Sequence, residues 1–420
     1  MRVGCGVFIL FLAVVLHLER QRGVPVWNSL WAEDGQVFLS DALHNVSGTL
    51  FAENGGYIHV VPRLIAGIVS TLPVHDAAAG MAIGATTAIA LIAGFVYFAS
   101  AEILSSRAAR LALAAAVLLL PVPGSELLAN VTNLHFYLLF GCFWALLWQS
   151  EQPAAVGARS AVALASALCD PLSALFLPLA IVAPLVRRTV RTLIVSGVFF
   201  AGIAVQLATM WGGARPERNW GFRLGAVPEI FSLRVAGGLL VGDRFLGDAW
   251  AALGRGFAYG ALVLVAAIIA GLVFRRDRRT VAFVLISLGY AGLFFAVQMA
   301  GRGTGNLDPD VRGFQLNGAR YISVPFLLMT AVILALVDRA PEHADGTAWR
   351  WRRRAGLVWI VTLLALNYSV TSDRSRGPRW DRELARARPA CSHAGSRTVK
   401  VLVSPAPPRV WFATVPCGRF

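Results

Sequence analysis

Long apolar segments recur from one end of the chain to the other, and they restrict the fold more than any other feature. Each has about 15–25 residues, near the length that crosses a hydrocarbon core about 30 Å thick, and each is bounded by Arg, Pro or Gly. Charged residues make up only 15% of the chain, whereas an ordinary soluble globule has roughly 25%. A hydrophobic content of 57% equally excludes disorder. The sequence therefore predicts an all-α membrane protein with many spans.

The net charge of +15, from 38 basic and 23 acidic residues, lies largely in short segments between the apolar runs. Arg-rich loops of this kind stay in the cytoplasm under the positive-inside rule, so the charge does not indicate nucleic acid. No P-loop, Rossmann or zinc-type motif is present. Four clusters mark the cytoplasmic side: Arg107 with Arg110, Arg187–Arg191, Arg275–Arg279 and Arg350–Arg354.

These markers predict eleven spans with the N-terminus in the cytoplasm and residues 19–56 and 371–420 outside. The spans are expected at residues 4–18, 78–99, 108–122, 134–149, 160–170, 172–186, 192–211, 250–273, 280–299, 319–337 and 355–370. Tyr57–Pro73 is expected to be an interfacial or re-entrant helix, because one more span there would place Arg107 outside. Arg63 supports this, since an Arg at the bilayer centre costs roughly 2.5–3.5 kcal/mol.

The first apolar run, Gly4–Leu18, has no small-residue cleavage site and is expected to remain as an uncleaved helix. Lys400 is the only lysine, and such an Arg bias is typical of GC-rich bacterial coding. We therefore expect a multi-pass protein of the bacterial inner membrane, with a transmembrane domain over residues 1–370.

The polar tail, residues 371–420, contains two cysteines, Cys391 and Cys417, and two β-like stretches, Thr398–Ser404 and Arg409–Pro416. A disulfide between these cysteines would fit an oxidising, extracytoplasmic side and a small hairpin cap. One conflict remains, because Arg374, Arg376 and Arg379 at the start of the tail would favour the cytoplasm under the positive-inside rule.

With this topology, the unusual polar residues collect on the external side, where ionisable groups at helix ends typically mark a water-filled cavity. They are Glu33, Asp34, Tyr57, His59, Arg63, Glu126, Asn130, Asn133, His135, Asp170, Arg215, Glu217, Arg218, Asp243, Arg244, Asp308, Asp310, Arg312, Arg320 and Tyr321.

Each of these residues also has a purely structural interpretation. Glu33 and Asp34 could cap a helix over Gln36–Leu43 as well as act in chemistry. Arg320 could extend to lipid headgroups. The remaining structural alternatives are interfacial positions for His59 and His135, interhelical hydrogen bonds for Asn130 and Asn133, and solvated loops for Glu217, Arg218, Asp308, Asp310 and Arg312.

Four stretches, by their order in the chain and their shared external side, resemble the GT-C superfamily of integral-membrane glycosyltransferases, which use polyprenyl-phosphate sugars. The stretches are Glu33-Asp34, Tyr57–Arg63, Arg110–Pro121 followed by Glu126–His135, and the turns at Asp170-Pro171-Leu172 and Arg320–Pro325. The likeness is greatest to the bacterial branch related to lipid A aminoarabinose transferases and protein O-mannosyltransferases. The chain departs from that branch in having Glu-Asp-Gly where relatives often have Asp-Glu, and only a short tail.

The resemblance implies an inverting transfer of a sugar to an acceptor in the cell envelope, without a nucleotide. Asp34 would then be the general base, and Glu33 would position the acceptor or help Asp34 hold a divalent cation. Arg63 and Arg320 would bind the donor phosphate. The residues expected to contact the sugar are Tyr57, His59, Glu126, Asn133, His135 and Tyr321.

Two other functions fit the same residues. A transporter or flippase for a lipid-linked glycan would need the cationic site but no base, although transporters often place polar residues at mid-membrane. A non-catalytic partner in an assembly complex would need neither. Neutral replacement of both Glu33 and Asp34 would leave such a partner unaffected.

Overall fold

The computed structural model describes residues 2–124, 126–212, 221–274, 276–305, 307–312, 318–338, 346–392, 397–405 and 410–420. Three residues expected in an external loop, Arg215, Glu217 and Arg218, lie outside this described part, as does Arg275 of one Arg cluster. The side chain of Arg312 is likewise outside it.

Helices account for most of the described chain. They are α1 (Arg2–Leu18), α2 (Ser40–His44), α3 (Val46–Thr49), α4 (Val60–Val69), α5 (Ala77–Ala99), α6 (Arg107–Leu118), α7 (Leu134–Leu147), α8 (Pro153–Ala167), α9 (Leu177–Arg187), α10 (Val190–Gly212), α11 (Ala226–Ile230), α12 (Gly238–Leu253), α13 (Arg255–Val273), α14 (Arg278–Arg302), α15 (Pro309–Arg312), α16 (Arg320–Asp338), α17 (Gly346–Leu366) and α18 (Trp380–Ala387). Two small antiparallel sheets pair β1 (Glu53–Asn54) with β2 (Tyr57–Ile58), and β3 (Thr398–Val403) with β4 (Trp411–Pro416).

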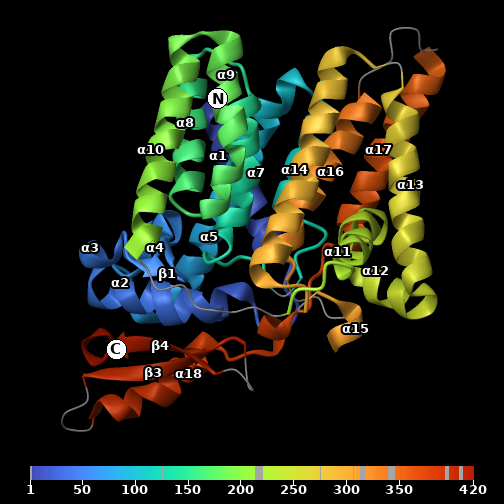
Figure 1. The fold of residues 1–420 in the computed structure, drawn as a ribbon. Coiled ribbons are helices and arrows are strands. Elements are labelled where there is room, and N and C mark those ends of the chain that lie inside the picture. Colours follow the sequence, from blue (N-terminus) through green and yellow to red (C-terminus); the bar gives the residue numbers. More distant parts are fainter. Residues whose placement is uncertain are drawn as a thin grey trace.

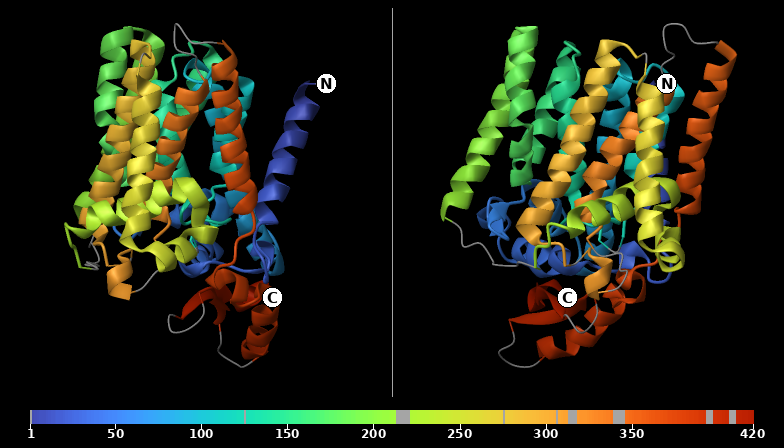
Figure 2. Two further views of the ribbon diagram at one scale, coloured as in Figure 1. Left: turned by 90° about the vertical axis from the view of Figure 1, so that its right-hand side faces the viewer. Right: turned by 45° about the vertical axis from the view of Figure 1, so that its right-hand side comes forward.

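The long helices pack side by side as a bundle (Figures 1 and 2). Five helical segments in the described part are long and apolar enough to cross a membrane: Val74–Glu102, Val190–Trp211, Arg255–Val273, Arg278–Arg302 and Arg320–Asp338. Shorter apolar helices, among them Gly4–Leu18 and Leu134–Leu147, accompany them. The chain is therefore a mainly helical protein of membrane-spanning character, as the apolar segments predict.

Helix α16 is the centre of this bundle. Every residue from Tyr321 to Asp338 is buried, and the helix packs against α6, α7, α14 and α17. Its sequence is apolar on all sides, which is the pattern of a helix enclosed by other helices. Any polar residue at an end of α16 is therefore held at the middle of the bundle's cross-section.

The N-terminus lies at one end of the bundle and the tail hairpin at the other (Figures 1 and 2). We call the first the arginine end, because ion pairs of Arg279 with Glu102 and of Arg353 with Asp338 join its loops. We call the second the tail end. It gathers the first loop (residues 19–72), residues 119–133, the turn at Asp170, and the tail.

The tail packs directly on the first loop. Strands β3 and β4 form a hairpin, and Cys391 and Cys417 form a disulfide with their Cα atoms 5.4 Å apart. Two backbone hydrogen bonds link Ser404 to the first loop, one with Leu30 and one with Ala32. A Cβ on Gly35 would lie 3.0 Å from the Val403 side chain, so the hairpin and the loop fit closely.

Several predicted boundaries differ from the structure. Helix α8 begins at Pro153, before residue 160, because Pro suits the first helical position and Arg159 is buried with its donors on Ala145 and Ser150 carbonyls. The span expected at 250–273 begins at Arg255, because Gly254 has φ of +51° and ends α12.

The predicted interfacial helix is also shorter than expected. Tyr57 and Ile58 pair in β2, and helix α4 covers only Val60–Val69. The last predicted span also differs: α17 ends at Leu366, four residues before the predicted limit of 370.

Candidate functional site

The first residue of α16, Arg320, lies at the tail end with two carboxylates near it. Its Nε atom is 3.6 Å from Oε2 of Glu126, and both side chains are largely enclosed, at 28% and 12% exposure. Glu33 also interacts electrostatically with the Arg320 guanidinium. The guanidinium lies 5.0 Å from the ring centre of Tyr321. Loops far apart in sequence thus place two acidic groups around one cation.

A cluster of rings continues from this cation toward the first loop. The ring centroids of Tyr57 and His59 are 4.3 Å apart, and those of His59 and His135 are 5.6 Å apart. The ring centroid of Phe136 lies 4.1 Å from that of His135 and 6.3 Å from that of Tyr321. Strand β2, helix α7 and helix α16 therefore bring together four of the residues that the sequence predicts for substrate contact.

Asp170 completes this cluster. Its Oδ2 atom is 2.6 Å from Nδ1 of His135, and both side chains are buried. Its Oδ1 accepts a hydrogen bond of 2.8 Å from the Leu172 amide, which makes Asp170 the N-cap of the 3-10 turn Pro171–Phe176.

Burial shifts the pKa values of two first-loop residues in this cluster. Burial lowers the pKa of His59 well below its usual value, and the nearby His135 and Arg63 add to this effect. Burial also raises the pKa of Tyr57; the charge of Asp170 adds to the rise, while Arg302 and Arg320 oppose it. The charges of Asp170 and Arg320 both affect the pKa of Tyr57, and the Tyr57 ring centroid lies 6.3 Å from that of His135. The ring cluster and the Arg320 carboxylates therefore form one site.

Two buried polar atoms in this site have no hydrogen-bond partner among the described residues. One is Nδ1 of His59, whose Nε2 is 3.2 Å from the Asn54 carbonyl. The other is Oε2 of Glu126. Buried polar groups are normally paired, so these atoms are candidates for contact with a ligand or water.

Asp34 lies beside the site, but both of its carboxylate oxygens are engaged in hydrogen bonds within the protein. It is 1% exposed, and its oxygens accept hydrogen bonds from the amides of Val131 and Thr132 and from the Thr132 hydroxyl. Burial raises the pKa of Asp34 to about 6, although these hydrogen bonds and the charge of Arg374 oppose the rise. Asp34 begins a π-helical segment, Asp34–Leu39, a form frequent at functional sites.

Two more predicted site residues have their polar atoms engaged in loop contacts. Arg63 donates to Asp41 and to the Ala52 carbonyl, both at 2.9 Å, and so ties the first loop to α4. The Asn133 side chain donates to the Glu126 carbonyl at 2.8 Å. These contacts shape the two loops that carry Glu33 and Glu126.

No sequence pattern indicates that Arg374 anchors the tail. It is 2% exposed and donates to the Ser29 hydroxyl and to the carbonyls of Val26, Ser29, Leu128 and Ala129. Ala129 has φ of +47°, which costs a non-glycine residue about 1–2 kcal/mol. Arg374 thus ties the tail, the first loop and a strained turn together, which explains its presence at the tail end despite the positive-inside rule.

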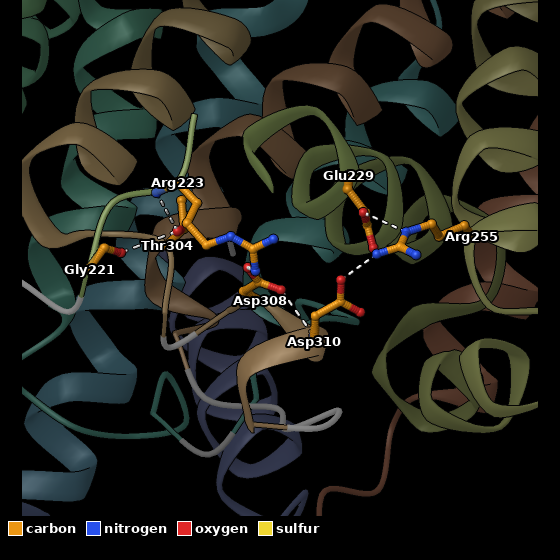
Figure 3. A network of polar contacts seen from close by, with 7 residues as sticks. All are labelled: Gly221, Arg223, Glu229, Arg255, Thr304, Asp308 and Asp310. Carbon is orange, nitrogen blue, oxygen red and sulfur yellow. Dashed lines mark hydrogen bonds and ion pairs between the residues drawn. The ribbon is translucent and has the colours of Figure 1, made fainter. Parts of the chain in front are cut away.

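A second polar network lies just after the C-terminal end of α14 (Figure 3). Asp308 is 2.9 Å from Arg223, and Arg255 bonds to both Glu229 and Asp310. From the sequence, Asp308 and Asp310 are external polar residues with a solvated loop as the structural alternative. In the structure their ion pairs join the segment around α15 to Arg223 before α11 and to Arg255 at the start of α13, and the sequence offers no signal for pairs whose partners lie 55 and 85 residues apart.

Asp243 and Arg244 are held within α12. Oδ2 of Asp243 accepts from the Gly124 amide at 2.7 Å, and the Arg244 amide donates to Asn367 at 2.9 Å. Both contacts join α12 to neighbouring segments, which favours a structural role for this pair.

No group of three or more His, Cys, Asp or Glu in the described part could hold a metal ion. A comparison with protein-family models finds no match for the chain, and a comparison with curated proteins finds none either.

Proposed function

We propose that the chain is an inverting glycosyltransferase of the GT-C type, moving a sugar from a polyprenyl-phosphate donor to an acceptor in the cell envelope. The observation that carries this proposal is Arg320, held on the first turn of the central helix with Glu126, Glu33 and a cluster of aromatic rings around it. A cation at the end of an apolar bundle suits a ligand that combines a lipid with a phosphate.

In this proposal the donor phosphate binds Arg320, displacing the long contact with Glu126. A guanidinium offers paired donors to phosphate oxygens, and it stabilises the charge that grows on the leaving phosphate. The freed carboxylate of Glu126 and the unpaired nitrogen of His59 then accept hydrogen bonds from sugar hydroxyls. Tyr57 and Tyr321 provide flat faces against which a sugar ring can pack.

The two adjacent acids have different roles. Glu33 is partly exposed, interacts with Arg320 and makes no side-chain hydrogen bond to a described residue, so it is placed to contact the acceptor. Asp34 positions Glu33 and the turn after Glu126 by holding residues 131 and 132. Arg63 supports the same loop and does not contact the phosphate.

The proposal includes eleven spans with the arginine end in the cytoplasm of a bacterial cell and the tail end outside it. The predicted cytoplasmic residues Arg187, Arg279 and Arg353 share one end of the bundle, opposite the disulfide-bonded tail. This arrangement supports the assignment of all four Arg clusters to the same side of the membrane.

The test is a transfer assay with purified protein, a panel of radiolabelled polyprenyl-phosphate sugars and crude envelope acceptor. Wild type should transfer one donor, and Glu33→Gln should slow transfer about 100-fold because the acceptor is no longer held in position. Glu53→Gln, an exposed acid of the same loop, is the matched control and should behave as wild type. Donor binding without transfer across the whole panel would reject the transferase and favour a flippase.

A further inference from the structure

The Asp170–His135 pair leaves one ring nitrogen available for chemistry. An ionised Asp170 that accepts from Nδ1 keeps the proton of neutral His135 on that nitrogen. The lone pair then resides on Nε2. Both oxygens of Asp170 are engaged, one by His135 and one by Leu172, so the carboxylate orients the ring and does not itself face a substrate.

A comparison with His17 shows why this pair differs from a structural histidine. His17 is also fully buried, but Nδ1 contacts the Leu118 carbonyl and Nε2 accepts from the Ala129 amide. Both of its nitrogens are used by the backbone. Nε2 of His135 has no hydrogen-bond partner among the described residues, and the ring lies against Tyr57 and His59 in the site.

The other candidate bases at the site are less suited to accept a proton. Asp34 is sealed by contacts to residues 131 and 132. Glu33 and Glu126 both interact with Arg320, which holds these carboxylates toward the donor phosphate. His135 differs from them because Asp170 orients its ring and its Nε2 has no hydrogen-bond partner among the described residues.

We infer that His135 is the general base of the transfer and that Asp170 is its positioning residue; this inference rests on the proposed function. Nε2 of His135 takes the proton of the acceptor hydroxyl while that oxygen forms a bond to the anomeric carbon. The bond from the anomeric carbon to the phosphate oxygen breaks, and its electron pair leaves with the lipid phosphate at Arg320. The imidazolium is stabilised by Asp170 and afterwards returns its proton to water.

The experiment measures donor binding and transfer separately in His135→Gln and Asp170→Asn. Gln can keep a hydrogen bond to Asp170, and Asn remains a good N-cap for the turn that follows it. His75 and Asp76 supply the matched control: they form an exposed pair, 3.3 Å apart, near the same end of the bundle. His75→Gln and Asp76→Asn should therefore leave both quantities unchanged.

We expect His135→Gln to lower kcat about 10²–10⁴-fold with little change in donor affinity, and Asp170→Asn to lower kcat in the same sense. The split between the two quantities separates this role from sugar binding: loss of a base lowers kcat, whereas loss of a residue that only holds the donor lowers donor affinity.

Three other outcomes would overturn the inference, and they are distinguishable. Transfer by His135→Gln at the wild-type rate rejects His135 as base and leaves the proposed function standing. Weakened donor binding with an unchanged kcat would show that the ring only binds the sugar. If wild type binds a donor and transfers none of the panel, the proposed function and this inference both fail.

Discussion

The two ends of the bundle contain similar residues and use them in opposite ways. At the arginine end, Arg279 pairs with Glu102 at 2.8 Å, and Arg187 donates to the carbonyls of Leu147 and Trp148. Asp338 accepts from both Ser105 and Ser106 and lies 3.5 Å from Arg353. These contacts close loops, although Oδ1 of Asp338 has only the ion pair with Arg353 and no hydrogen bond among the described residues.

At the tail end, the charges lie beside a cluster of rings. Oε2 of Glu126 has only the 3.6 Å ion pair with Arg320, and Nδ1 of His59 has no hydrogen-bond partner among the described residues. A protein keeps such groups at a cost in stability, because each buried, unpaired polar atom costs about 1–3 kcal/mol. The two ends differ in what surrounds their charges: those of the arginine end join neighbouring loops, whereas those of the tail end border the ring cluster of the candidate site.

The largest expected effect tests this contrast directly. Arg320→Gln should lower transfer about 10³-fold, because the leaving phosphate loses its cation. Arg279→Gln removes an exposed ion pair at the other end and should leave transfer unchanged, with a cost in stability below about 1 kcal/mol. The measurement is the transfer rate of both variants beside wild type. Equal losses in the two variants would remove the distinction between the ends.

Hydropathy located the long apolar helices, because each carries its own apolar run and needs no distant partner to reveal it. It placed the start of α8 at residue 160, after Arg159, whereas the helix begins at Pro153. The structure satisfies that guanidinium on carbonyls of the preceding loop, and such backbone acceptors leave no trace in sequence.

The candidate site was predictable only in part. Topology alone placed Glu126, His135 and Arg320 on one side, since their positions at helix ends follow from the order of spans. It could not pair His135 with Asp170, which requires α7 to pack on the turn after α8. It also could not show that Asp34 is sealed, because the amides that bind it lie 97 and 98 residues away.

The second prediction asks whether the tail is part of the site's support. Arg374→Met should destabilise the protein by about 3 kcal/mol, because a buried side chain with donors on five oxygens is lost and the carbonyls stay buried. Arg379→Met, which removes an exposed contact with Asp381, should have a much smaller effect, because water screens an exposed ion pair. Thermal unfolding in detergent compares the two. A similar small loss in both would mean that the tail is only a loose cover.

The smallest effect concerns Asp34 and depends on pH. The pKa of Asp34 is about 6 in the folded protein and near 3.8 when the residue is exposed, so the folded state binds the proton more tightly. The resulting stabilisation is complete below about pH 4 and is lost as the pH rises through 6, by up to about 3 kcal/mol at 1.36 kcal/mol per pKa unit. The Asp34 contribution to stability therefore falls between pH 4 and 6, and it is measured as the difference in melting temperature between wild type and Asp34→Asn, because buried His59, whose pKa is lowered, contributes in the opposite sense.

The stability of wild type relative to Asp34→Asn should fall over this range, because the amide does not ionise. Asp381→Asn is the control: contact with Arg379 lowers the pKa of Asp381 to about 2, so the residue does not titrate in this range. If wild type and Asp34→Asn show the same slope, the carboxylate is not desolvated in the folded protein. The tail end would then be open to water at Asp34, and the acid could contact a substrate directly instead of holding the turn at residues 131 and 132.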